Sequence, residues 1–317
     1  MDPLFSSPLF AASLPPAPRR PLLAALFSLV LPGFGQFYNG EVNKAIWLFL
    51  GFSLLLIPGT ALVALYLPAR AMMPALLLSL AGALGLWGYA VGNAYRQARR
   101  LPDYRPAVWQ RSGAYALVFL MCNVLALPLL LSTVRGQLVE SFHIPSTSME
   151  PSIRQGDVLF ADKRYNCGGC QSGIARGDVA IFTYPNDRTL KYIKRIIALP
   201  GDTVELLGAE VKVNGQSLSV PGSVRPGPAP EIEIVSERSG EQQWQVQRTT
   251  QGVGSVSLRL TVPPGQVFVL GDNRTLSRDS RSFGTVPMPD VVGRAHQLWF
   301  SRGAEGVRWE RLGQVVE

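Results

Sequence analysis

Two serines and one lysine are the residues of this chain best suited to hydrolytic chemistry. Ser146 and Ser148 lie two positions apart, and Lys194 follows downstream. A serine hydroxyl becomes a good nucleophile only when a base takes its proton. Histidine is the usual base, but the chain contains only 2 histidines. Lysine is the main alternative, so the scarcity of histidine points to a serine–lysine pair.

Lys194 stands out because lysine is rare in this chain. Five lysines accompany twenty-five arginines, and arginine cannot serve as a base because it does not deprotonate. A lysine can, if apolar surroundings lower its pKa from about 10.4 by several units. The apolar neighbours along the chain are Tyr192, Ile193, Ile196, Ile197 and Leu199. The alternative, a strand-end lysine that reaches solvent, suits Lys191 better.

The segment around the serines has the character of an exposed edge. In an extended chain, alternation places Phe142, Ile144 and Ser146 on one face. Pro145 and Pro151 lack backbone donors, which indicates an edge strand or a loop open to a peptide partner. Ser146 is then a candidate hydrogen-bond donor to an oxyanion. Both serines capping turns is the alternative that spacing alone leaves open.

The first part of the chain predicts a multi-span α-helical membrane domain over residues 1–134, with three to four spans. Its uncharged runs, each about the twenty residues that a crossing helix needs, are Pro21 to Gly40, Ala45 to Ala69, Ala71 to Tyr95 and Ser112 to Val134. Proline and glycine interrupt the first run between Leu31 and Gly40, which favours either a broken span or a re-entrant segment. Arg19 and Arg20 resemble the start of a signal peptide, but no small-residue cleavage site follows.

Charge indicates an orientation for this domain. Residues 1–134 hold nine Lys and Arg against three Asp and Glu, whereas the remainder holds 21 and 19. The basic excess therefore flanks the spans, which argues against a nucleic-acid partner. An arginine cluster places the loop before the last run in the cytoplasm: Arg96, Arg99, Arg100, Arg105 and Arg111. Residues after Arg135 are then extracytoplasmic; four crossings would put the N-terminus outside too, which Arg19 and Arg20 contradict.

Residues 135–317 predict a mostly antiparallel β catalytic domain. Its clearest strands are 158–161, 179–184, 192–199, 211–213 and 267–270, separated by Gly-Asp turns. A hairpin is expected between 232–235 and 244–247 with its turn at Ser239-Gly240, within an insertion near 217–262. The proline-rich stretch Arg225 to Pro230 is expected to be a linker or loop.

The three cysteines suggest one structural bond and no metal site. Cys167 and Cys170 form a C-x-x-C pair, for which a disulfide is the first interpretation in an oxidising compartment. A zinc half-site would need two further ligands, and no second pair exists. Cys122 lies inside the last apolar run and is expected to be an apolar filler. No metal and no cofactor are expected.

Four motifs together resemble the ordered boxes of bacterial type I signal peptidases. They are Ser146 to Pro151, Gly156 to Val158, Lys191 to Asp202 and Gly271 to Arg281. They keep the family's order and spacing from Phe142 to about Arg294. The family usually has one to three anchoring spans, and the region Leu22 to Arg100 goes beyond that; its role, extra anchoring or partner contact, stays open.

The resemblance implies a role for individual residues. Ser148 is the expected nucleophile and Lys194 the general base, Ser146 and the Ser148 backbone N–H bind the oxyanion, and Ser277 orients the amine. Asp279 and Arg281 brace the site, with Asp272, Asn273 and Arg274 as a supporting turn. The expected walls of the shallow substrate pockets are Phe142, Ile144, Pro145, Met149, Ile153, Tyr192 and Ile193. His143 is expected to be a bystander and His296 a structural residue.

The expected function is removal of signal peptides from exported preproteins by a membrane-bound Ser/Lys endopeptidase. Its partners would be preproteins, the lipid bilayer and the secretion machinery. Its place would be the bacterial inner membrane, with the catalytic domain on the periplasmic side. Two alternatives are a dedicated maturase of one secreted partner and a non-catalytic, membrane-anchored peptide-binding β module.

Overall fold

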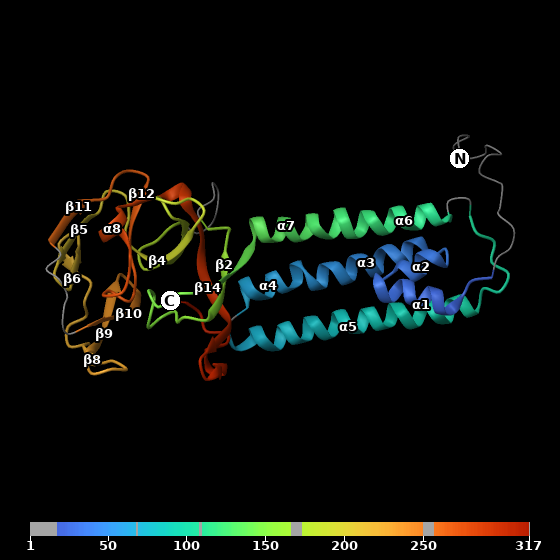
Figure 1. Cartoon of the computed structure of the whole chain (residues 1–317), viewed down its shortest axis with the longest axis horizontal. Coiled ribbons are helices and arrows are strands. Elements are labelled where there is room, and N and C mark those ends of the chain that lie inside the picture. Colours follow the sequence, from blue (N-terminus) through green and yellow to red (C-terminus); the bar gives the residue numbers. More distant parts are fainter. Residues whose placement is uncertain (1–17, 68, 108–109, 166–172, 250–256, 317) are drawn as a thin grey trace. The chain divides into compact units, whose positions relative to one another are not determined.

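The computed structural model describes residues 18–67, 69–107, 110–165, 173–249 and 257–316. Contacts within the chain divide it into two compact units, Met1–Arg135 and Gly136–Glu317. The first unit is built of helices and the second mainly of strands (Figure 1). Cys167 and Cys170, the pair expected to form a disulfide, lie outside the described residues.

Three helical stretches, the last of which ends just past the first unit at Gln137, are long and apolar enough to cross a membrane. They are Val42–Val63, Ala71–Arg99 and Ser112–Gln137. The first contains α3 (Val42–Leu56) and most of α4 (Pro58–Tyr66), the second lies in α5 (Ala69–Arg99), and the third joins α6 (Ser112–Leu120), a π-helical segment η3 (Met121–Ala126) and α7 (Leu127–Gln137). Pro128, two residues after the end of η3, has no backbone N–H to donate within this helix.

The run from Pro21 to Gly40 does not form one long helix. It folds into α1 (Pro21–Val30) and α2 (Phe34–Tyr38). Ten helical residues extend only about 15 Å, half of a bilayer's hydrocarbon thickness. Polar side chains of the run instead bond the backbone of α5: Gln36 Nε2 donates to Ala90 O at 2.7 Å and Asn39 Nδ2 to Ala94 O at 2.9 Å. Proline and glycine thus break the run into two short helices, and whether it enters the membrane stays a prediction.

In the described part of the second unit all pairs of named strands are antiparallel, and one isolated bridge, Gln247 to Asn273, is parallel. An eight-stranded sheet has the order β1 (Val139–His143), β2 (Asp157–Asp162), β14 (Val291–Gly303), β3 (Val179–Thr183), β4 (Lys191–Ala198), β12 (Gln266–Leu270) and β13 (Val286–Pro287), with β15 (Gly306–Val307) paired to β14. A four-stranded sheet joins β11 (Ser257–Thr261), β5 (Thr203–Leu207), β6 (Glu210–Val213) and β7 (Gln216–Ser217). A three-stranded sheet joins β10 (Gln242–Thr249), β9 (Ile232–Ser239) and β8 (Arg225–Pro226).

Short helices complete the β unit. They are α8 (Ser280–Phe283) and two 3₁₀ turns, η4 (Met288–Asp290) and η5 (Trp309–Arg311). The antiparallel prediction is confirmed, as are its five clearest strands. The predicted hairpin forms as β9 and β10, but β9 continues through Ser239, so the turn is Gly240–Glu241. Residues Arg225–Pro226, expected in a loop, pair with β9 as a short strand.

Strand β4 contains Lys194, and the second half of the strand is buried on both faces. This burial is the reason that its residues are mostly apolar. Ile196 packs into one core cluster with Phe182, and Ile197 into another with Phe268, so both faces of the strand are covered. Side chains of successive residues point to opposite faces of a strand, which separates Lys194 from Arg195.

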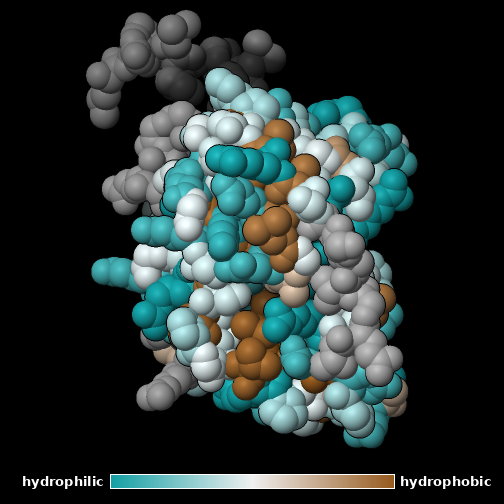
Figure 2. Space-filling model, turned by 90° about the vertical axis from the view of Figure 1, so that its left-hand side faces the viewer, coloured by the Kyte–Doolittle hydropathy of each residue, from teal (hydrophilic) through white to brown (hydrophobic). Residues whose placement is uncertain are grey.

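On the face of the molecule shown in Figure 2, hydrophobic side chains form a broken band between hydrophilic ones.

Candidate active site

The structure brings Ser148 and Lys194 into contact. Lys194 Nζ lies 2.8 Å from Ser148 Oγ, and its other hydrogen bond is to Ile193 O, also at 2.8 Å. Lys194 is 3% exposed and Ser148 9% exposed. A nucleophile and a base at this distance are close enough for direct proton transfer.

Burial changes the protonation of this lysine. Removal from water disfavours the ammonium and lowers the pKa of Lys194 to about 8, although the negative charges of Asp279 and Asp272 raise it. Lys194 has no ion pair among the described residues. About a tenth of the amine, against well under 0.1% for an ordinary lysine, is therefore neutral at pH 7 and can accept a proton.

Ser148 is positioned by the loop that follows the edge strand β1. Ile144 N donates to Asp157 O at 2.9 Å, and Gly156 N donates to Ile144 O at the same distance. Met149 and Ile153 have no exposed surface and lie in the core beneath the loop. These contacts hold the segment at both ends, so the serine is presented on a backbone with little freedom.

Ser146 lies beside the nucleophile on the exposed side of the loop. Its Oγ is 3.2 Å from Ser148 Oγ, and the residue is exposed. Its hydroxyl is therefore accessible next to Ser148 Oγ, and its expected role as an oxyanion donor stays a prediction.

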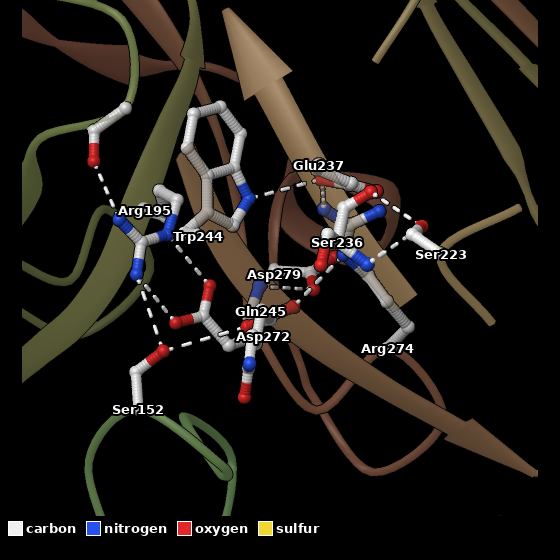
Figure 3. Close-up of polar contacts among 12 residues, drawn as sticks. Ser152, Arg195, Ser223, Ser236, Glu237, Trp244, Gln245, Asp272, Arg274 and Asp279 are labelled. Carbon is white, nitrogen blue, oxygen red and sulfur yellow. Dashed lines mark hydrogen bonds and ion pairs between the residues drawn. The ribbon is translucent and has the colours of Figure 1, made fainter. Parts of the chain in front are cut away.

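The turn after β12 hydrogen-bonds the backbone carbonyls of Ser148 and of the residue before it. Asn273 N donates to Ser148 O at 3.2 Å, and Asn273 Nδ2 donates to Thr147 O at 3.2 Å. Asp272 accepts two hydrogen bonds from Arg195, at 2.8 Å from Nε and 2.7 Å from Nη2 (Figure 3). Both partners are buried. The turn thus links the serine loop to the residue next to Lys194 on β4.

Asp279 and Arg281 form a second ion pair below the site. Arg281 Nη2 lies 2.7 Å from Asp279 Oδ2, which also accepts from Gly271 N at 3.0 Å. Burial alone would raise the pKa of Asp279, but the hydrogen bonds and charge of Arg281 outweigh it and hold that pKa below its ordinary value. Asp279 also caps α8 by accepting from Arg281 N. The carboxylate therefore stays ionised and fixes the backbone at Gly271.

Ser277 packs against Gly271 but does not hydrogen-bond the lysine amine. A Cβ at Gly271 would lie 2.1 Å from Ser277 Oγ and 2.5 Å from Ser148 O. Only glycine permits this close approach. Among the described residues Ser277 Oγ is buried without a hydrogen-bond partner, so its expected role in orienting the amine stays a prediction.

The residues expected to line the substrate pockets differ in burial. Ile144 is 3% exposed and packs with Met149 and Ile153 in one core cluster, against which Phe142 and Ile193 lie. Tyr192 belongs to a neighbouring cluster and stacks on Tyr184 with ring centroids 4.4 Å apart. Phe142, Tyr192 and Ile193 are only partly buried and Pro145 is exposed, so these four can contact a peptide directly.

Three residues near the site were missed by the sequence reasoning. Arg195 was passed over because it follows the base, although alternation along β4 sends it to the opposite face. Glu237 and Trp244 lie on the β9–β10 hairpin, outside all four motifs. The signal was that Glu237 follows Val235 by two positions and Trp244 precedes Val246 by two, so alternation places each beside an apolar residue on one face of its strand.

Comparison with known proteins gives consistent matches. The family model described as signal peptidase, peptidase S26, matches residues 115–300. Signal peptidase I of Pseudomonas aeruginosa is 31% identical over 193 residues, which cover 53% of this chain and 67% of the relative. Signal peptidase I of Rickettsia conorii is 27% identical over 230 residues, 61% of this chain and 79% of the relative. A solved signal peptidase I from Enterococcus faecalis V583 is 33% identical, covers 39% of this chain and 97% of its own, and superposes with a TM-score of 0.26.

Proposed function

The chain belongs to the signal peptidase family, peptidase S26, and is therefore a hydrolase that removes signal peptides; on this premise we propose that Ser148 and Lys194 form its catalytic dyad. The observation that carries the proposal is the 2.8 Å contact between Lys194 Nζ and Ser148 Oγ. The lowered pKa of Lys194 supports the role of base.

In the proposed reaction, neutral Lys194 takes the proton of Ser148 as Oγ attacks the scissile carbonyl. Ser146 Oγ and the Ser148 backbone N–H donate to the oxyanion that forms. The Lys194 ammonium then gives its proton to the leaving amine, and the carbon–nitrogen bond breaks. Water, deprotonated by the same amine, hydrolyses the acyl-enzyme and regenerates Ser148.

The substrate is proposed to lie extended along the unpaired edge of β1. In the described sheet β1 pairs with β2 on one side only, so its other edge can receive a peptide strand. Phe142, Pro145, Tyr192 and Ile193 would contact the residues before the cut, with Ile144, Met149 and Ile153 as the pocket floor. A floor of buried, well-packed side chains leaves little depth, which favours small substrate residues and rejects large ones.

We further propose that three spans anchor the enzyme in the bacterial inner membrane. The arginines between the second and third spans put that loop in the cytoplasm. Three crossings then place the N-terminus inside, in agreement with Arg19 and Arg20, and the β unit on the periplasmic side. There it would meet preproteins emerging from the secretion machinery.

The test measures cleavage of a preprotein by the purified full chain in detergent. Ser148→Ala, Lys194→Ala and Lys194→Arg are expected to be inactive, the last because arginine keeps its proton. Ser217→Ala and Lys212→Ala, at solvent-facing positions of β7 and β6, are matched controls and should cleave normally. Activity in any of the three dyad variants would remove Ser148 and Lys194 from their roles.

A further inference from the structure

The β9–β10 hairpin lies outside the four motifs, yet two of its side chains contact residues that hold the proposed nucleophile in place. Trp244 contacts Arg195, and Glu237 pairs with Arg274. Figure 3 shows Trp244 between Arg195 and Glu237, with its indole nitrogen directed at the Glu237 carboxylate. The Arg195 guanidinium carbon lies 5.0 Å from the centre of the Trp244 ring. The hairpin thus contacts Arg195, which follows Lys194, and Arg274, which follows the residue that bonds the Ser148 carbonyl.

Glu237 is a buried carboxylate with two partners. It is 1% exposed, accepts from Trp244 Nε1 at 3.0 Å, and forms an ion pair with Arg274. Arg274 is itself 9% exposed and donates from Nε to Gly271 O at 3.2 Å. A buried charge is strongly unfavourable unless it is paired and hydrogen-bonded. Each of these two side chains therefore restricts the position of the other.

The backbone of the hairpin continues this link to the serine. Gln247 N donates to Asp272 O, and Arg274 N donates to Gln247 O, both at 2.8 Å. Between these two residues, Asn273 bonds the carbonyl of Ser148. The turn 271–274 is thus bonded on one side to the hairpin and on the other to the nucleophile's own backbone. A shift of this turn would displace the Ser148 N–H that is proposed to bind the oxyanion.

The charges around the site also balance without the lysine. Each carboxylate is matched to one guanidinium: Asp272 to Arg195, Glu237 to Arg274, and Asp279 to Arg281. Each of these three carboxylates is already paired, and in the described part of the chain Lys194 forms no ion pair with any of them. Loss of the Glu237 charge would leave the buried Arg274 guanidinium without its ion-pair partner. The turn 271–274, which contains both Arg274 and Asp272, would then lose one of the contacts that fix it.

We propose that Glu237 is a positioning residue for the peptide-bond hydrolysis: by holding Arg274 it fixes the turn Gly271–Arg274, and through Asn273 the backbone of Ser148. The proposal rests on the proposed function of the dyad. It assigns the hairpin a part in the transition state, because an oxyanion donor acts only when it is placed where the charge develops. Substrate contacts lie elsewhere, on the β1 edge.

The test compares Glu237→Gln with Glu233→Gln in the full chain in detergent. The first removes the buried charge but keeps an acceptor for the indole N–H. The control removes a carboxylate on the same strand, whose pair with Arg248 is partly exposed at 3.2 Å. We expect Glu237→Gln to lower kcat at least tenfold with KM changed less than twofold, and Glu233→Gln to stay within twofold of wild type in both.

A double-mutant cycle separates positioning from general loss of structure. If Glu237 acts through Arg274, the double variant Glu237→Gln/Arg274→Gln should be no slower than Arg274→Gln alone. Should Glu237→Gln fail to fold, Trp244→Phe decides. It removes the indole donor to Glu237 together with part of the buried ring that faces Arg195, and a two- to fivefold lower kcat at unchanged KM is expected. A kcat within twofold of wild type in a folded Glu237→Gln, or a loss confined to KM, overturns the inference. An active Ser148→Ala would instead overturn the proposed dyad, so the two failures are distinct.

Discussion

The protonation of Lys194 should set the pH dependence of cleavage. With a pKa of about 8, the neutral fraction of the amine rises from about 1% at pH 6 to about 90% at pH 9. The second-order rate constant kcat/KM should therefore rise about 90-fold over this range, with unit slope below pH 7.5 and a bend near pH 8. A lysine at its ordinary pKa near 10.4 would be about 100-fold less available at pH 8.

The assay is initial-rate cleavage of a preprotein at low concentration, between pH 5.5 and 10, with Ser148→Ala as the blank. Because kcat/KM reports the free enzyme, the bend belongs to the unoccupied site. The enzyme must be shown to recover full activity after each incubation, so that denaturation does not mimic titration. A rate that still climbs tenfold per unit above pH 9.5, or one that is flat across the range, would refute the assignment of Lys194 as base.

Three further outcomes follow from the same contacts. Lys194→Met should raise the free energy of unfolding at pH 7 by up to about 3 kcal/mol, because the pKa of Lys194 is lower in the folded than in the unfolded chain and its protonation therefore destabilises the fold. Thermal unfolding should show this gain in stability shrink as the pH rises from 8 to 10. An unchanged gain at pH 10 would contradict this. Ser146→Ala should lower kcat by about 10²–10³ with little change in KM, and a loss seen only in KM would place Ser146 in substrate binding. Gly271→Ala should lower both kcat and the melting temperature, since its Cβ would meet Ser277 Oγ at 2.1 Å and Ser148 O at 2.5 Å; wild-type values for both would show that the turn can yield.

Several features could be predicted because they depend on local chemistry. The five clearest strands follow from short β-branched and aromatic runs between glycine-containing turns. The pairing of Ser148 with Lys194 followed from the scarcity of histidine, the apolar run around the lysine and the order of the four motifs. The apolar runs near Ala45, Ala71 and Ser112 match the three long helices, because a run of this length has few other ways to satisfy its backbone in lipid.

Other features were missed because they depend on packing between distant segments. The longest strand, β14, was not predicted, since His296, Gln297 and Ser301 interrupt its apolar pattern; Gln297 and Ser301 are fully buried. Proline and glycine predicted the break in the run from Pro21 to Gly40, but not the hydrogen bonds that Gln36 and Asn39 donate to the backbone of α5.

The amino-acid sequence by itself determined the candidates for the chemistry, one lysine in apolar surroundings and two serines two residues apart, as well as the uncharged runs long enough to cross a bilayer. These properties reside in residue type and spacing. Only the tertiary structure decided that Asp272 pairs with Arg195 and Glu237 with Arg274, and that Glu237 and Trp244 lie next to the turn that bonds Ser148. These partners are 77 and 37 positions apart, and no local pattern encodes such a contact, whereas the neighbours Asp279 and Arg281 were already expected together from their motif.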